Sequence, residues 1–225
     1  MGRIARVLGV VLLVWLAVTC SAVLALRWVA PPFTAVMLEQ PGSLSKLEYR
    51  WVDSNAIASS AARAAMAAED QRFLEHHGID FVSLDRALGD YREGDGLRGA
   101  STITQQVAKN LFLWQGRSFV RKALEAYFAL LIELVWSKQH ILETYLNVAE
   151  FGPGVFGVEA AAQRFFGVPA SRLTAPQAAL LAAVLPNPHR LNVARPSAYV
   201  RSRQGWILTQ MRLLESRGHY VGLAW

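Results

Sequence analysis

A pair of adjacent carboxylates stands out first among the residues that could do chemistry. Glu69 and Asp70 lie at the end of an alanine-rich run, in the string EDQRFLEHHG. Phe73 and His76 follow Glu69 at i+4 and i+7, which would place all three on one face of a continuous helix. A carboxylate beside another in partly apolar surroundings has a raised pKa, as a general acid or base near neutral pH requires. The alternative is a solvated helix end without a chemical role.

A cation-rich segment forms a second candidate site. Arg117, Arg121 and Glu125 lie four residues apart, so they share one face of an expected helix. Lys122 lies three residues before Glu125, on nearly the same face. The group fits a salt-bridged helix surface. It equally fits a pyrophosphate cradle with an embedded carboxylate, because arginine binds phosphate oxygens in pairs and lysine adds a compact charge.

The string GASTITQQ, residues 99–106, leads from a glycine-rich loop into an expected helix. Hydroxyls and free backbone N–H groups at a helix start suit an anion. Lys109 follows Gln105 by four residues and shares its face. Ordinary capping of the helix is the alternative. The string is not a Walker loop, because the glycine spacing and the Lys-Ser/Thr pair are missing.

Metal and serine-hydrolase chemistry have weaker support. His76 and His77 lack the spacing of an HExxH motif, which favours structural histidines and no metal site. Ser101 has no G-x-S-x-G setting, which argues against a hydrolase triad. The single cysteine, Cys20, excludes an intramolecular disulfide and a multi-cysteine metal site.

The elements that must position these residues are predicted to be helices. The 225 residues are 53% hydrophobic and 18% charged, which excludes a disordered chain. No alternation is strong enough for a large sheet. Caps and apolar periodicity predict helices over residues 56–75, from 80, from 101 or 102, 118–136, from 138, 158–166, 175–185 and 197–217.

Residues 7–26 are an uncharged apolar run that predicts a membrane anchor. Twenty helical residues span about 30 Å, the thickness of a hydrocarbon core. Arg3 and Arg6 precede the run, which favours a cytoplasmic N-terminus of residues 1–6. A cleaved signal peptide is the alternative. Residues 27–52 are expected to be a linker and residues 53–225 one domain outside the cytoplasm.

The net charge of +6 suits an anionic partner such as a lipid surface or a phosphate-bearing substrate. A position outside the cytoplasm argues against nucleic acid. Apolar side chains crowd the segment next to the cations, which is either part of the core or an interfacial patch that dips into lipid. These are Phe112, Leu113, Trp114, Phe119 and Val120.

Taken together, these strings resemble the peptidoglycan glycosyltransferases, family 51, which also form the N-terminal domain of class A penicillin-binding proteins. The motif E-D-x-x-F-x-x-H-x-G matches residues 69–78, G-x-S-T-I-T-Q-Q-x-x-K-N residues 99–110, and R-K-x-x-E residues 121–125. I-L-E-x-Y-L-N matches residues 141–147, and an alanine- and leucine-rich helix ending in P-N-P covers residues 178–188. Five motifs in order make the resemblance to the monofunctional, membrane-anchored members highly specific.

The resemblance implies an all-α, lysozyme-like domain of two lobes, one of them a jaw that contacts the membrane, preceded by one transmembrane helix. It implies the substrate lipid II, a disaccharide-pentapeptide on undecaprenyl pyrophosphate. The growing strand would be the donor and lipid II the acceptor. Inverting transfer to the acceptor's 4-hydroxyl would form β-1,4 links and release undecaprenyl pyrophosphate.

The resemblance also implies roles for residues. Glu69 would be the general base, and Glu125 a second essential glutamate that orients the cations and the sugars. The residues expected to bind substrate are Asp70, Phe73, His76, Ser101, Thr102, Gln105, Gln106, Lys109, Asn110, Arg117, Arg121 and Lys122. No metal is required, although Mg²⁺ or Mn²⁺ at the pyrophosphate is compatible with the substrate.

The expected location is the cytoplasmic (inner) membrane of a bacterium, with the catalytic domain in the periplasm. The expected partners are lipid II, the glycan strand, the bilayer, and other cell-wall synthesis or division proteins. Two rival functions remain open at this point. One is a lysozyme-like enzyme that cleaves glycan, against which the cations at Lys109, Arg117, Arg121 and Lys122 argue. The other is a catalytically silent scaffold for cell-wall assembly.

Overall fold

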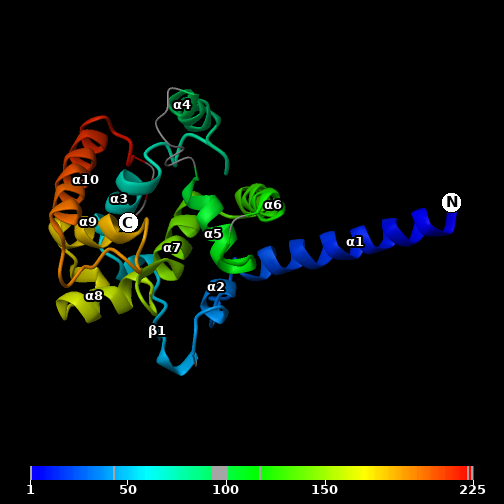
Figure 1. The fold of residues 1–225 in the computed structure, drawn as a ribbon, viewed down its shortest axis with the longest axis horizontal. Coiled ribbons are helices and arrows are strands. Elements are labelled where there is room, and N and C mark those ends of the chain that lie inside the picture. Colours follow the sequence, from blue (N-terminus) through cyan, green and yellow to red (C-terminus); the bar gives the residue numbers. More distant parts are fainter. Residues whose placement is uncertain (1, 43, 93–100, 117, 222, 224) are drawn as a thin grey trace.

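The computed structural model describes the chain except residues 1, 43, 93–100, 117, 222 and 224 (Figure 1). Its α-helices are α1 (Gly2–Ala25), α2 (Ala35–Leu38), α3 (Ser59–Glu69), α4 (Phe81–Arg92), α5 (Ile103–Phe112), α6 (Phe119–Val135), α7 (Lys138–Val148), α8 (Val158–Phe166), α9 (Ala175–Val184) and α10 (Ala198–Ser216). Its 3-10 helices are η1 (Leu44–Lys46), η2 (Ser54–Ala56) and η3 (Ala170–Arg172), and its strands are β1 (Glu48–Tyr49), β2 (Glu150–Gly152) and β3 (Val155–Phe156). The predicted class, a mainly α-helical domain after one apolar N-terminal helix, is confirmed.

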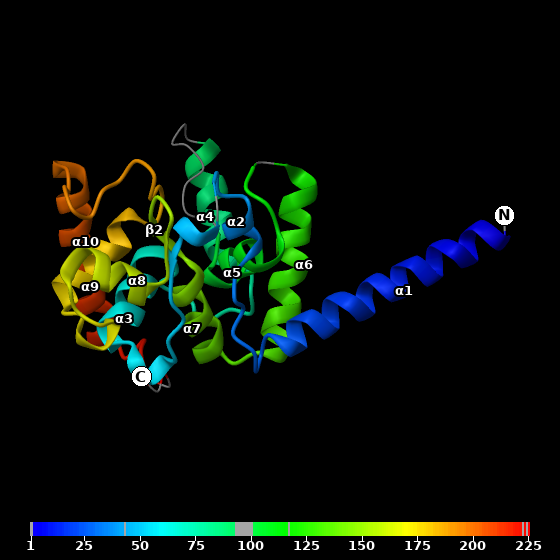
Figure 2. The same cartoon turned by 90° about the horizontal axis from the view of Figure 1, so that it is seen from below.

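The core is built around α9, which packs against α3 and α10. Every residue from Ala178 to Val184 is buried, and the many alanines let the neighbouring helices approach closely. A second group forms where α5 packs against α6 and α7. Figure 2 shows α8, α9 and α10 gathered at one end of the domain and α6 at the other, with α5 and α7 between them. Helices α3 and α5 carry the candidate site between these two groups.

The small sheet connects the segment after α1 to the rest of the domain. Strand β3 lies between the other two strands, parallel to β1 and antiparallel to β2. Glu48 pairs with Val155 and Tyr49 with Phe156. Part of the expected linker, residues 27–52, is therefore hydrogen-bonded to the folded domain.

Side-chain caps begin several of the helices, as the sequence predicted. Asp80 accepts from the N–H groups of Val82 and Ser83 at the start of α4, at 3.0 and 3.1 Å. Thr102 begins α5 and Ser137 begins α7. A cap of this kind stabilises a helix by about 1 kcal/mol because it satisfies otherwise free N–H groups.

Helix α3 ends earlier than the sequence predicted. Its last residue is Glu69, whereas the apolar pattern predicted a helix to residue 75. Asp70 leaves the helical conformation, with φ −158° and ψ 80°, and its carboxylate turns to the start of α5. Gly78 has φ +83°, and a Cβ there would lie 3.1 Å from the carbonyl oxygen of Ala129 in α6. The segment 70–78 is therefore a tight loop that crosses α6, and Phe73 and His76 do not share a helix face with Glu69.

Helix α1 is long and apolar enough to cross a membrane, and its second half is docked on the domain. Thr19 and Tyr127 of α6 share a hydrogen bond of 2.8 Å between their hydroxyls, and Trp15 packs on the same tyrosine ring. The Trp136 indole N–H donates to the carbonyl of Val23 at 2.9 Å. The first half of α1 projects away from the domain (Figure 1). The second half of α1 is therefore attached along α6 and its C-terminal end.

Candidate active site

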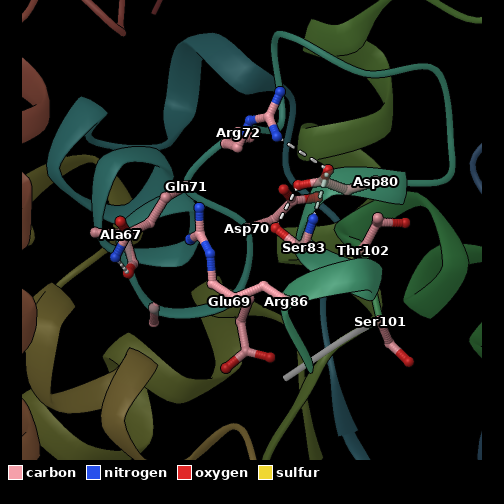
Figure 3. A pocket seen from close by; sticks show the side chains of 11 residues that line it. Ala67, Glu69, Asp70, Gln71, Arg72, Asp80, Ser83, Arg86, Ser101 and Thr102 are labelled. Atoms are coloured by element: carbon pink, nitrogen blue, oxygen red, sulfur yellow. Dashed lines mark hydrogen bonds and ion pairs between the residues drawn. The ribbon is translucent and has the colours of Figure 1, made fainter. Parts of the chain in front are cut away.

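Glu69 lies at the end of α3, on the wall of a cavity that α4 and the start of α5 also line. In Figure 3 its carboxylate points away from the group formed by Asp70, Asp80 and Ser83. Ser101 lines the same cavity. The position makes Glu69 accessible from the cavity, although only 13% of its side chain is exposed.

The surroundings of Glu69 make it a better proton acceptor than an exposed carboxylate. Burial raises the pKa of its carboxyl group above the ordinary value, and the charge of Asp70 adds to this. The hydrogen bond from Gln106 and the cations of Arg203 and Lys109 oppose that rise in pKa. The Gln106 amide donates to Oε2 at 2.9 Å, and Arg203 Nη2 lies 3.5 Å from Oε1. Burial is the largest influence, so the carboxyl is more basic than an exposed glutamate.

Asp70 is a structural neighbour of Glu69. Its two oxygens lie 3.0 Å from His76 Nε2, and Oδ2 accepts the N–H of Ile103 at 3.0 Å. His76 is buried, and Phe73 has no exposed surface and lies in the core. The loop 70–78 turns the side chains of Phe73 and His76 inward, so neither lines the two cavities of the described structure. Their contact with substrate stays a prediction. Asp70 borders the cavity, but its oxygens already accept hydrogen bonds.

Thr102 and Gln105 close the start of α5. Thr102 Oγ1 accepts from the N–H of Gln105, and Gln105 Oε1 accepts from the N–H of Thr102, both at 3.1 Å. With the N–H of Ile103 bonded to Asp70, three N–H groups near the helix start have partners within the protein. Of the two alternatives that the sequence left open for this string, ordinary capping is the one seen in the structure. Both side chains are buried and act in the capping box.

The predicted cation group exists in the structure. Glu125 on α6 is 3% exposed, and its oxygens accept from Arg121 at 2.6 Å and from Lys122. Lys122 also donates to Ser101 Oγ at 2.9 Å, which joins α6 to the residue before the helix start of α5. Arg117, which was predicted to belong to this group, lies outside the described residues.

Lys109 lies close enough to both Glu69 and the group of Arg121, Lys122 and Glu125 for their charges to act on its pKa. Burial lowers its pKa below the ordinary value, the charge of Glu125 opposes that fall, and the charge of Arg121 adds to it. Lys109 and Asn110 line a second cavity together with Arg121, Gln106 and Tyr145. Glu150, Asn187 and His189 border the same cavity from later parts of the chain. Glu69 lines the first cavity and Gln106 lines the second, and the two side chains are hydrogen-bonded. The Glu69–Gln106 pair therefore lies between the two cavities.

Two residues that contact the Glu69–Gln106 pair were not assigned to the site from the sequence. Arg203 comes from α10, 134 positions after Glu69, and lies in none of the five strings. Tyr145 lies in the string I-L-E-x-Y-L-N, where its spacing on a helix was a signal for core packing. In the structure it is fully buried, and its hydroxyl lies 3.4 Å from Gln106 Oε1. These residues reach Glu69 only through the packing of α7 and α10.

One group of side chains has the composition of a metal site. Ligand atoms of Asp70, His76 and Asp80 lie within 4.8 Å of one another. Asp80 already accepts from Arg72, Ser83 and two backbone N–H groups, while Asp70 is bonded to His76 and a backbone N–H. The oxygens are thus engaged in hydrogen bonds, as a structural cluster requires.

Comparisons with known proteins agree with this geometry. The family described as Transglycosylase matches residues 37–212, which is most of the chain, and the chain belongs to that family. Proteins named biosynthetic peptidoglycan transglycosylase are similar to it over nearly their whole length. Those of Shigella boydii serotype 4 (strain Sb227) and Escherichia coli (strain K12 / DH10B) are each 56% identical over 209 residues, covering 89% of this chain and 86% of the relative. That of Stutzerimonas stutzeri (strain A1501) is 51% identical over 217 residues, covering 93% of this chain and 89% of its own.

Proposed function

We propose that this chain polymerises peptidoglycan glycan strands from lipid II. The family, the names of its relatives, and a buried glutamate beside a group of cations support this function. The acceptor's 4-hydroxyl oxygen bonds to the anomeric carbon of the growing strand. The bond from that carbon to the pyrophosphate oxygen breaks, and the lipid pyrophosphate leaves with the electron pair.

Glu69 is the base of this reaction, and its geometry is the observation that carries the proposal. Attack by the hydroxyl requires an acceptor for its proton, and Glu69 provides a carboxylate with a raised pKa on a cavity wall. Gln106 holds Oε2 at 2.9 Å, so Oε1 is the more weakly held oxygen. The proton therefore moves from the hydroxyl to Oε1.

The cations stabilise the leaving group. Lys109 and Arg121 line the second cavity, so they neutralise charge on the pyrophosphate as the bond breaks. Glu125 fixes Arg121 and Lys122 through its two buried oxygens and thereby acts as a positioning residue. Ser101 and Asn110 contribute polar groups at the edges of the two cavities.

A divalent cation fits the described residues poorly. Magnesium and manganese prefer carboxylate and carbonyl oxygens. Glu125 is bonded to two cations, and Glu150 on the second cavity accepts from Gly154 N and contacts His189. The side chains of Lys109 and Arg121 supply the charge compensation without a metal step.

The decisive experiment measures polymerisation of fluorescently labelled lipid II by the full chain in detergent. We expect a ladder of long glycan that a muramidase digests to disaccharide units. Purified sacculi incubated with the same protein should release no muropeptides. Release of muropeptides without any polymer would instead support the glycan-cleaving enzyme. A folded protein with neither activity would support the silent scaffold.

We further propose that the chain is a single-pass protein of the bacterial cytoplasmic membrane, with residues 1–6 in the cytoplasm and the domain in the periplasm. The apolar helix α1 and the arginines before it support this orientation. Cell-wall synthesis and division proteins are the partners expected there. Nucleic acid is not expected in the periplasm.

The apolar residues next to the cations divide into two kinds. Leu113 is 3% exposed and belongs to the core, which is one of the two alternatives that the sequence left open for this segment. Phe119 is 97% exposed at the start of α6, and Trp114, Val120 and Leu134 are exposed as well. A helix face of this kind in a chain with a membrane anchor favours contact with the bilayer surface.

This contact predicts lipid access at position 119. The full chain with Cys20→Ala and Phe119→Cys, labelled with a fluorophore, should be quenched strongly by brominated lipids in vesicles. Thr209→Cys, an exposed residue of α10 at the far end of the domain, is the matched control and should be quenched little. Equal quenching at both positions would contradict the membrane contact.

A further inference from the structure

Arg203 lies against the proposed base although it belongs to the last helix. Its Nη2 is 3.5 Å from Glu69 Oε1 and 3.4 Å from the carbonyl oxygen of Ala68. Its side chain is 21% exposed. The guanidinium is therefore held between α10 and the end of α3, beside a single oxygen of the carboxylate.

The contact is long for an arginine–carboxylate pair. Such pairs commonly form two parallel hydrogen bonds of about 2.7–2.9 Å. A tight pair would occupy both oxygens of Glu69 and strongly lower its basicity. The Arg203 contact instead involves one oxygen at 3.5 Å, while Gln106 holds the other at 2.9 Å. The charge of Arg203 thus acts on Glu69 while Oε1 stays able to accept a proton.

The orientation of Gln106 follows from its second neighbour. The hydroxyl of Tyr145 donates to Gln106 Oε1 at 3.4 Å, which directs the amide N–H₂ of Gln106 to Glu69. Burial raises the pKa of Tyr145 well above its ordinary value, so this hydroxyl keeps its proton. Tyr145 and Gln106 therefore fix Oε2 without contributing a positive charge.

Two cations from other helices act on Glu69: Lys109 on α5 and Arg203 on α10. The titratable groups that act on it are Asp70 at the end of α3, Lys109 on α5, Tyr145 on α7 and Arg203 on α10, and Arg72 and Arg86 line the same cavity. Lys109 also faces Glu125 and Arg121 and lines the second cavity. A pyrophosphate bound in the second cavity would pair with Lys109 and thereby weaken the effect of the lysine charge on Glu69.

We infer that Arg203 is a positioning residue that keeps Glu69 ionised while Lys109 neutralises the pyrophosphate. The inference rests on the proposed polymerase function. Burial raises the pKa of Glu69 and Arg203 opposes it, so removal of the arginine charge should raise the pKa further. The base then becomes protonated at a higher pH, and activity is lost sooner as the pH falls.

The test is the pH dependence of kcat/KM for lipid II polymerisation by the full chain. In Arg203→Gln and Arg203→Met the acidic limb should move up by about one pH unit, at the lower end of what a neighbouring opposite charge produces. Most of the wild-type rate should return at alkaline pH. Arg203→Lys keeps the charge, and its acidic limb should stay close to that of the wild type. Arg201→Gln removes the same charge from an exposed position on α10 and serves as the matched control.

Two results would overturn the inference, and they are distinguishable. If Arg203→Gln and Arg203→Met lower the polymerisation rate by the same factor at every pH, Arg203 only supports the packing of α10 against α3. If the wild type makes no polymer at any pH, the proposed function fails and the inference fails with it. Polymer from the wild type with a shifted limb in the neutral variants, and an unshifted limb in the Lys variant, supports the role of Arg203.

Discussion

Glu69→Gln should reduce polymerisation of lipid II by about 10²–10⁴-fold, the usual contribution of a general base. The amide has nearly the shape of the carboxyl group and can still accept the hydrogen bond from Gln106, but it cannot take the proton of the acceptor hydroxyl. The initial rate of glycan formation at the wild-type optimum pH, measured on labelled lipid II, gives the size of the effect.

The matched control for this change is Glu75→Gln. Glu75 is an exposed carboxylate in the loop after α3, paired with Arg72 on the surface. Its amide variant should polymerise at close to the wild-type rate, and both variants should unfold at close to the wild-type temperature. A Glu69→Gln protein that keeps a rate within a few-fold of the wild type would place the base elsewhere.

Glu125→Gln should affect both stability and activity. The carboxylate is buried with two cations, and loss of one partner of a buried ion pair costs about 3–5 kcal/mol. We expect the lower end of that range because the Lys122 side chain is 46% exposed and can turn to water. Thermal unfolding in detergent measures this loss.

The effect on activity has a predicted sign with respect to pH. The charge of Glu125 raises the pKa of Lys109, against the effect of burial. Without it, the pKa of Lys109 falls further, so Lys109 loses its proton at a lower pH. The alkaline limb of the polymerisation rate should therefore move to lower pH, while the maximal rate falls by about 10²-fold if the loss resembles that of one oxyanion donor.

Glu133→Gln separates the two effects of Glu125→Gln. Glu133 lies on the same helix, and its buried carboxylate pairs with Lys138 at 2.7 Å outside both cavities. This variant should lose comparable stability with an unchanged alkaline limb. If the limb moves equally in both variants, it reports general loosening of α6 instead of the charge on Lys109.

The sequence predicted the helical class and the apolar N-terminal helix, because helix caps and apolar periodicity are local signals. It placed the end of α3 wrongly. Residues 70–75 continue an acceptable helical pattern, but in the structure the Asp70 carboxylate accepts the N–H of Ile103 and contacts Nε2 of His76. That competing bond joins residues 33 positions apart, and no local pattern contains it.

The composition of the site was only partly predictable. The Thr102–Gln105 pair fits a capping-box signature, which is why helix capping was one of the two alternatives for this string. Arg203 could not be predicted from the sequence. Helical spacing gives the face of α10 on which it lies, but the partner across that face depends on how α10 packs against α3 and α9.

In the proposed membrane topology, the docking of α1 on α6 limits how far the domain can stand from the bilayer. Only residues 2–14 of α1 lie beyond the contacts that begin at Trp15. As a helix they measure about 20 Å, which is shorter than a hydrocarbon core of about 30 Å. If α1 spans the bilayer as proposed, the end of α6, with its exposed Leu130 and Leu134, enters the leaflet on the side of the domain. Withdrawal of a polyprenyl chain from the bilayer costs about 0.8 kcal/mol for each CH₂ group that leaves the hydrocarbon core. An enzyme partly embedded in the leaflet would allow the lipid tail to stay in the membrane while the head group reacts.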